Sequence, residues 1–208
     1  GSRLHRVEWE AVLDRLASLT EPPKFVVGSG SMPPGAPDDF YARVARQAKA
    51  LGAKTVIDTS GPALAAALAE GVTVIKPNLV EFMAYTKNSL ERDDERIAAC
   101  RQLTADGRAE IVALTLGDQG ALLVTADRAW RALPLKIEAV STVGAGDSFL
   151  GGLVAALAAG RPLEEAFRVA VASASAAVRM PGTGLCQPED VKRLLPEVQI
   201  KEIARALA

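Results

Sequence analysis

The chain has 208 residues, and its 24 basic and 25 acidic side chains leave a formal net charge of −1. A balance so close to neutral argues against a nucleic-acid-binding surface and against a basic membrane-binding patch. No apolar run approaches the ~20 residues that a transmembrane helix needs, so we expect no membrane partner.

Cysteine and histidine usage narrows the class of protein further. Cys100 and Cys186 lie far apart and have no CxxC neighbour, which is typical of reduced thiols. The first ten residues lack the apolar segment of a signal peptide, so we expect a cytoplasmic protein. His5 is the only histidine, which argues against a histidine-based metal site and a Ser-His-Asp triad.

Helix-like and strand-like segments alternate along the chain. Apolar residues at helical spacing predict helices at 7–19, 38–52, 62–71, 79–86, 93–107, 145–159, 163–179 and 188–195. Short apolar runs predict strands at 24–29, 54–60, 72–78, 110–117, 121–127 and 128–135. Four of these strands are apolar on both faces and are separated by helices, which is typical of parallel strands between helical layers. We therefore expect a single α/β domain over residues 1–208.

Glycines and polar residues collect where four of the predicted strands end. The sequences that follow these strands are GSGSMPPG, DTSG, KPNLVE and GDQG, beginning at residues 28, 58, 76 and 117. In an open parallel sheet, ligands bind outside the carboxyl ends of the strands. The sequence therefore predicts a ligand site at this edge of the sheet.

The segment STVGAGDSFLGG, residues 141–152, has the composition of an anion site at a helix start. If a helix begins near Ala145, the amides of Gly144, Ala145 and Gly146 lack intrahelical partners, and the helix dipole favours a phosphate there. Asp147 would repel that phosphate unless it accepts a proton from a hydroxyl that attacks it. The alternative is a first-turn acid that only stabilises the helix, with glycines that only pack.

The segment KPNLVE supplies candidate ligands for a divalent cation. Asn78 and Glu81 lie about one helical turn apart, and an amide with a carboxylate suits Mg²⁺ held through its waters. Lys76 could neutralise phosphate. The alternative is a helix cap in which Asn78 and Glu81 form a capping box, and the two roles are compatible.

Other motifs are weaker or missing. TLGDQG, residues 115–120, is suited to a turn whose backbone approaches a nucleotide, although a simple hairpin turn accounts for Gly117 and Gly120 equally well. The chain has no GxxxxGK[ST] motif and no GxGxxG motif that opens a βαβ unit, which argues against a P-loop NTPase and against a dehydrogenase.

Four segments, in their order along the chain, resemble motifs of the PfkB (ribokinase-like) family of carbohydrate kinases. They are SGSMPPG, KPNLVE, TLGDQGAL and STVGAGDSF. The resemblance runs from about Lys24 to Leu195, and STVGAGDSF is similar to the family's C-terminal signature. SGSMPPG and GTGLC most resemble the sugar-phosphate branch, which contains 6-phosphofructokinases, 1-phosphofructokinases and tagatose-6-phosphate kinases. The resemblance implies a three-layer α/β/α sandwich and ATP-dependent phosphoryl transfer to a sugar phosphate.

The resemblance also implies roles for individual residues. Asp147 would be the catalytic base, and the amides of Gly144, Ala145 and Gly146 would form the anion hole. Asn78 and Glu81 would organise Mg²⁺, and Ser31 would contact the sugar phosphate. The residues expected to contact ATP are Lys76, Asn78, Thr115, Gly117 and Gly120. Carbonyl groups that could hold a monovalent cation such as K⁺ belong to Ser141, Val143, Ala177 and Gly182.

One departure from the family pattern is large. Family members begin with further strands, a Gly-Gly sugar-binding motif and a small β-sheet lid, none of which we find in residues 1–208. The chain therefore resembles the C-terminal two-thirds of a kinase, whose full-length form we expect to be a homodimer. Two alternatives remain: a nucleoside or small-alcohol kinase of the same fold, and a non-catalytic nucleotide-binding remnant.

We predict that the 208-residue chain alone binds Mg·ATP weakly and does not turn over sugar phosphate. The nucleotide motifs are present, whereas the sugar-binding motif and the lid are not. Calorimetry with Mg·ATP and a coupled assay for ADP release measure the two quantities. Robust turnover by the purified chain would contradict the prediction.

Overall fold

The computed structural model describes residues 2–182 and 184–204. The chain divides into two compact units, Gly1–Ala113 and Leu114–Ala208, and the division falls within the fourth strand. The expectation of a single domain over residues 1–208 stays a prediction.

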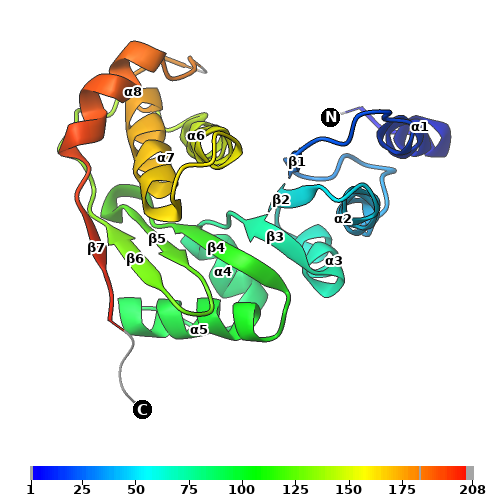
Figure 1. Cartoon of the computed structure of the whole chain (residues 1–208), viewed down its shortest axis with the longest axis horizontal. Coiled ribbons are helices and arrows are strands. Elements are labelled where there is room, and N and C mark those ends of the chain that lie inside the picture. Colours follow the sequence, from blue (N-terminus) through cyan, green and yellow to red (C-terminus); the bar gives the residue numbers. More distant parts are fainter. Residues whose placement is uncertain (1, 183, 205–208) are drawn as a thin grey trace. The chain divides into compact units, whose positions relative to one another are not determined.

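The first unit alternates strands and helices, as the hydrophobic pattern predicts (Figure 1). Its strands are β1 (Phe25–Ser29), β2 (Lys54–Asp58), β3 (Val72–Ile75) and the start of β4 (Ala109–Thr115). Its helices are α1 (Arg6–Ala17), α2 (Phe40–Ala50), α3 (Gly61–Glu70), α4 (Leu79–Thr86) and α5 (Asp93–Ala105).

The strands of the first unit pair in parallel, in the order in which they occur in the sequence. β1 pairs with β2, β2 with β3, and β3 with β4. Val56, Ile57, Val74 and Ile75 are fully buried, which accounts for the apolar composition of both faces of these strands. Parallel pairing brings the carboxyl ends of β1, β2 and β3 to one edge, as the sequence predicts.

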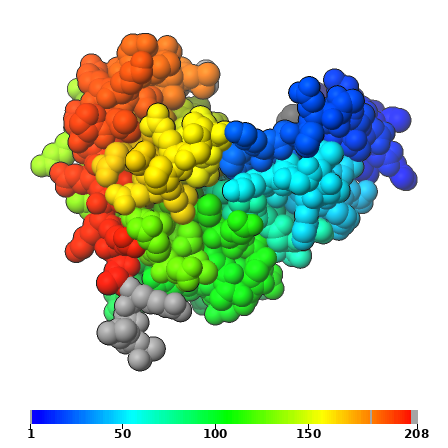
Figure 2. Space-filling model, in the orientation of Figure 1, coloured from blue at the N-terminus to red at the C-terminus, as the bar shows by residue number. Residues whose placement is uncertain are grey.

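Helix α1 packs against α2 through aromatic side chains. The ring of Trp9 meets Phe40 edge-on at 6.5 Å, and the guanidinium of Arg43 lies 5.1 Å from the Trp9 ring. Figure 2 shows the dark blue surface of α1 continuous with the lighter blue surface of α2. Along the chain, α1 precedes β1, and the loop that follows β1 leads into α2.

The second unit combines antiparallel strands with helices. It contains the 3₁₀ turn η1 (Gly117–Gln119), β5 (Ala121–Val124), β6 (Ala129–Ala132), α6 (Ala145–Ala158), α7 (Leu163–Ala177), α8 (Pro188–Leu194), the 3₁₀ turn η2 (Leu195–Glu197) and β7 (Ile200–Glu202). β6 pairs antiparallel with β5 and with β7. Sequence reasoning missed β7, because three residues with exposed or half-buried side chains carry no apolar run.

Two further expectations can be compared with the structure. Within the described ranges, no helix has the length and apolar character needed to cross a membrane. Cys100 and Cys186 are both free thiols, as their spacing predicts. Burial raises the pKa of the Cys100 thiol, so this cysteine is an inert core residue.

Helices α6 and α7 approach closely at a glycine. A Cβ atom added to Gly152 would lie 2.5 Å from Ser173 Oγ and 3.2 Å from the carbonyl oxygen of Val169. Phe149 and Phe167 also meet edge-on between these helices, with ring centroids 6.2 Å apart. By contrast, the neighbouring Gly151 is exposed, and nothing lies within 4 Å of the position of its Cβ.

These adjacent glycines supply a matched pair of substitutions. We predict that Gly152→Ala lowers the free energy of unfolding by ~1–3 kcal/mol, because the new methyl group overpacks the α6–α7 contact. Gly151→Ala should instead raise it by up to ~1 kcal/mol, because alanine is the better helix former and the space is open. Urea denaturation of both variants measures the difference. Equal effects would show that the close approach at Gly152 does not constrain the fold.

Candidate active site

Lys76 follows β3 directly and lies in a buried ion pair. Its Nζ atom lies 3.1 Å from Oδ2 of Asp58 at the end of β2, and the two side chains are only 6% and 15% exposed. The amide of Lys76 donates to the carbonyl of Ile57 at 3.1 Å, which ties it to the adjacent strand. The ammonium predicted to contact ATP thus already has one carboxylate partner, which sequence reasoning missed.

Asn78 and Glu81 form the capping box that the sequence allowed. Oδ1 of Asn78 accepts from the Glu81 amide at 2.9 Å, and Oε2 of Glu81 accepts from the Asn78 amide at 2.9 Å. The structural alternative is therefore confirmed, and α4 begins at Leu79 as predicted. Within the described part of the chain, no group of three or more His, Cys, Asp or Glu side chains gathers for a metal ion. Binding of Mg²⁺ at Asn78 and Glu81 stays a prediction.

Ser31 is exposed in the loop after β1, and that loop is anchored at both ends. At its start, the Gly30 amide donates to the Asp58 carbonyl at 2.9 Å. The Gly30 carbonyl accepts from the hydroxyls of Tyr41 at 3.0 Å and Thr59 at 2.9 Å. At its end, the Leu4 amide donates to the carbonyl of Pro34 at 2.8 Å.

The turn from Thr115 to Gly120 begins where β4 ends. The Leu116 amide donates to the Gly120 carbonyl at 2.8 Å, and the Gly120 amide donates to the Gly117 carbonyl at 3.2 Å. Gly117 has a φ of +62° with nothing near its Cβ position, so this face of the turn is open to a ligand. Gly120 has a structural role, because its Cβ would lie 2.3 Å from the carbonyl oxygen of Ala132, and its contact with ATP stays a prediction. Close packing against β6 is sufficient reason for glycine at that position.

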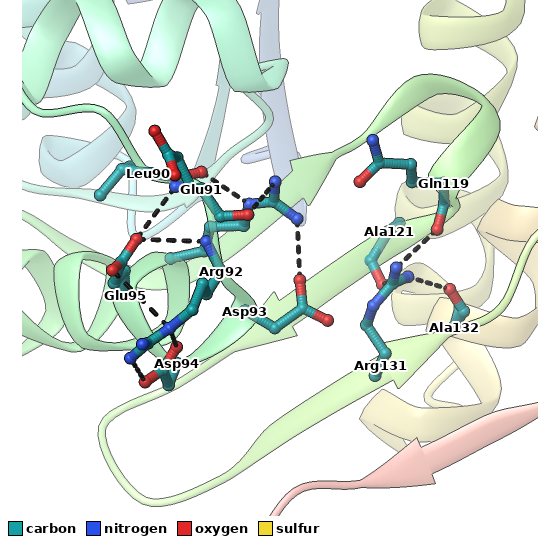
Figure 3. A network of polar contacts seen from close by, with 11 residues as sticks. Leu90, Glu91, Arg92, Asp93, Asp94, Glu95, Gln119, Ala121, Arg131 and Ala132 are labelled. Atoms are coloured by element: carbon teal, nitrogen blue, oxygen red, sulfur yellow. Dashed lines mark hydrogen bonds and ion pairs between the residues drawn. The ribbon is translucent and has the colours of Figure 1, made fainter.

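Arg131 on β6 donates hydrogen bonds to the backbone in and beside this turn, and no sequence motif indicated this role. Its guanidinium donates to the carbonyls of Gln119 at 2.6 Å and Ala121 at 3.4 Å, and also to the carbonyl of Ala132 (Figure 3). The labelled side chains in Figure 3 show the guanidinium directed at the backbone of the turn. The turn is therefore fixed by its own chain before any ligand binds.

Helix α6 begins at Ala145, as predicted, after Gly144 in the left-handed conformation with a φ of +79°. The Ala145 amide makes one long contact of 3.4 Å with the Thr142 carbonyl. Among the described residues, neither the Gly144 amide nor the Gly146 amide meets an acceptor. Asp147 is exposed in the first helical turn beside these amides. Binding of an anion by these amides, and a catalytic role for Asp147, stay predictions.

The structure brings together the two segments expected to hold a monovalent cation. The Ser141 hydroxyl donates to the Gly182 carbonyl at 2.9 Å and accepts from the Val143 amide at 3.2 Å. The Ala177 carbonyl accepts from the Met180 amide at 2.9 Å. Among the residues that the structure describes, each of these two carbonyls thus has a donor, Met180 for Ala177 and Ser141 for Gly182. Cation binding by this group stays a prediction.

Known proteins resemble this chain over most of its length. The ATP-dependent 6-phosphofructokinase isozyme 2 of Mycobacterium tuberculosis is 36% identical over 193 residues, covering 93% of this chain and 57% of that protein. The 1-phosphofructokinase of Xanthomonas campestris pv. campestris is 36% identical over 204 residues, covering 95% of this chain and 61% of that protein.

A solved structure extends the comparison to three dimensions. Phosphofructokinase-2 from Escherichia coli in complex with potassium superposes with a TM-score of 0.89 at 33% identity, covering 95% of this chain and 64% of that one. This likeness confirms the predicted ribokinase-like α/β fold.

The chain thus spans roughly three-fifths of the length of these relatives. The model of the family described as "pfkB family carbohydrate kinase" matches residues 5–190, a range that includes every predicted site residue. The chain belongs to the pfkB family of carbohydrate kinases.

Proposed function

We propose that this chain carries the nucleotide-binding and catalytic part of an ATP-dependent kinase that phosphorylates a hydroxyl of a sugar phosphate. The observation that carries the proposal is the start of α6, where Asp147 stands beside the open amides of Gly144 and Gly146. The relatives named above are phosphofructokinases, which supports a phosphorylated sugar as the acceptor.

In this proposal, Asp147 is the general base. Its carboxylate takes the proton from the acceptor hydroxyl as that oxygen attacks the γ-phosphorus of ATP. The bond from the γ-phosphorus to the bridging oxygen breaks, and ADP leaves. The amides of Gly144, Ala145 and Gly146, together with the positive end of the α6 dipole, stabilise the charge that spreads over the transferring phosphoryl oxygens. A helix start supplies these donors in fixed positions, so little reorganisation is needed during transfer.

The remaining site residues bind and orient the nucleotide and the sugar phosphate. Thr115 and Gly117 present the turn backbone to the nucleotide, with Gly120 shaping the turn, and Ser31 contacts the phosphate of the sugar. Lys76 neutralises phosphate charge, with Asp58 holding its ammonium.

The donor sets suit the expected ions. Mg²⁺ keeps several waters and needs few protein ligands, so the side-chain oxygens of Asn78 and Glu81 fit it. When bound, it would neutralise charge on the ATP phosphates. The carbonyls of Ser141, Val143, Ala177 and Gly182 are suited to K⁺, and the E. coli relative was solved with potassium. We also propose that the full-length protein forms a homodimer.

We predict that Asp147→Asn, in the protein expressed from the complete gene, lowers kcat by ~10²–10⁴-fold. Asparagine keeps the size of the side chain but cannot accept the hydroxyl proton. The structural value of an acid in the first helical turn is only ~0.3–1 kcal/mol, so folding should survive. The nucleotide Kd should change little. Steady-state kinetics and calorimetry of both proteins decide, and retention of more than about a tenth of the rate would exclude a base role of this size.

We further predict that Glu81→Gln in the same protein raises the Mg²⁺ concentration needed for half-maximal activity. Glutamine still accepts the Asn78 amide, so the cap is kept while the charge that attracts a cation is lost. The KM for the sugar phosphate should stay within about twofold. Titration of activity with Mg²⁺ at fixed ATP measures the effect, and an unchanged requirement would leave Glu81 as a helix cap only.

A further inference from the structure

Gly30, the residue before Ser31, has all of its backbone hydrogen-bonding capacity satisfied. Its amide donates to the Asp58 carbonyl, and its carbonyl accepts from two side-chain hydroxyls, those of Tyr41 and Thr59. A carbonyl oxygen has two acceptor positions, so both are filled by protein rather than by water. The Gly30 peptide is therefore fixed in space although the residue itself is exposed.

The two hydroxyl donors are buried, whereas Ser31 is not. Tyr41 is 5% exposed and Thr59 is 6% exposed, while Ser31 lies at the surface. Burial, reinforced by the negative charge of Asp58, raises the pKa of the Tyr41 phenol. The phenol thus keeps its proton and remains a donor.

A glycine within β1 makes the position of Tyr41 attainable. A Cβ added to Gly28 would lie 2.6 Å from Cε1 of Tyr41 and 3.2 Å from Cδ1 of Ile57. Only glycine at residue 28 lets the phenol ring lie this close to the strand. The ring then reaches past the strand end, and its hydroxyl meets the Gly30 carbonyl at 3.0 Å.

The same contacts join the Ser31 loop to the residue that follows β3. Asp58 accepts the Gly30 amide with its backbone carbonyl and pairs with Lys76 through its carboxylate. Thr59, the next residue, donates to the Gly30 carbonyl. Asp58 and Thr59, at the end of β2, thus bind the backbone of Gly30, and Asp58 also binds the ammonium of Lys76.

We propose that Tyr41 and Thr59 are positioning residues that fix the Gly30 peptide and thereby orient Ser31 toward the phosphate of the sugar-phosphate substrate. This inference rests on the proposed function, in which Ser31 contacts that phosphate. The two hydroxyls act only through Gly30 and do not touch the substrate. Their effect should therefore appear in the KM for the phosphorylated sugar and not in the KM for ATP.

The test compares Tyr41→Phe, Thr59→Val and their combination in the protein expressed from the complete gene. The probe substrates are fructose 6-phosphate and fructose 1-phosphate, each with Mg·ATP. Because a hydrogen bond contributes on the order of a fivefold change in an equilibrium constant, each single substitution should raise the KM for the accepted sugar phosphate about fivefold. The double variant should raise it more than either single one. The KM for ATP should stay within about twofold, and Thr59→Ser should restore the original value.

Two neighbouring residues provide matched controls in the same unit. The Tyr85 hydroxyl accepts from Arg108 at 3.3 Å, and the Thr86 hydroxyl donates to the Phe82 carbonyl at 3.0 Å. Tyr85→Phe and Thr86→Val therefore remove the same atoms from side chains whose hydrogen-bond partners lie outside the Ser31 loop. Neither control should change the KM for the sugar phosphate.

A second measurement does not depend on activity. Hydrogen exchange of the 208-residue chain, followed by mass spectrometry over residues 29–36, should be about tenfold faster in the Tyr41→Phe, Thr59→Val double variant than in the unsubstituted chain. The two control variants should leave that segment unchanged. Equal exchange in the double variant and the unsubstituted chain would overturn the inference, whatever the kinetics show.

The KM of the Ser31→Ala variant, measured in parallel, distinguishes the positioning role of Tyr41 and Thr59 from the proposed contact of Ser31 with the substrate. If Ser31→Ala raises the KM for sugar phosphate while the Tyr41 and Thr59 variants do not, the positioning role is wrong and the proposed function stands. If Ser31→Ala leaves that KM unchanged, the proposed contact of Ser31 is wrong, and the inference fails with it.

Discussion

Asp58 is the residue on which the binding edge of the first unit depends, through its ion pair with Lys76 and its backbone hydrogen bond to Gly30. It neutralises the buried ammonium of Lys76 at 3.1 Å, and its backbone carbonyl fixes the loop that follows β1. An unpaired buried charge costs ~3–5 kcal/mol, so neither member of the pair is dispensable. Parallel pairing of β1, β2 and β3 is what brings these strand ends within reach of one another.

Several site residues have a structural role that coexists with the proposed chemical one. The Glu81 carboxylate caps α4 with one oxygen, which leaves its second oxygen available to a cation or its waters. Asp147 is a favourable first-turn acid at α6 and also lies in the same helical turn as the open amides. A structural role seen in the fold is therefore no argument against a catalytic role for the same residue.

The sequence was sufficient to predict those helices and strands whose local residue preferences favour the same structure as their packing. The Asn78 and Glu81 spacing predicted the start of α4 at Leu79, and the glycines before Ala145 predicted the start of α6. β7 was missed because it is defined by its pairing with β6, which no local sequence signal encodes. Tyr41 and Arg131 were also missed, because each acts on a backbone carbonyl distant in the sequence, and no motif encodes such a contact.

The glycines illustrate why a motif alone does not identify a ligand site. Gly28 and Gly120 are required by neighbours that a Cβ would strike, Tyr41 and Ala132 respectively. Open space and a positive φ are also insufficient, because Gly52 and Gly107 have both and lie just after the ends of α2 and α5. These two glycines lie at the C-terminal end of a helix, where unpaired carbonyl groups form the negative end of the dipole. This end of a helix repels phosphate. Gly144 precedes its helix, so its open space lies beside amides at the positive end, where an anion is stabilised.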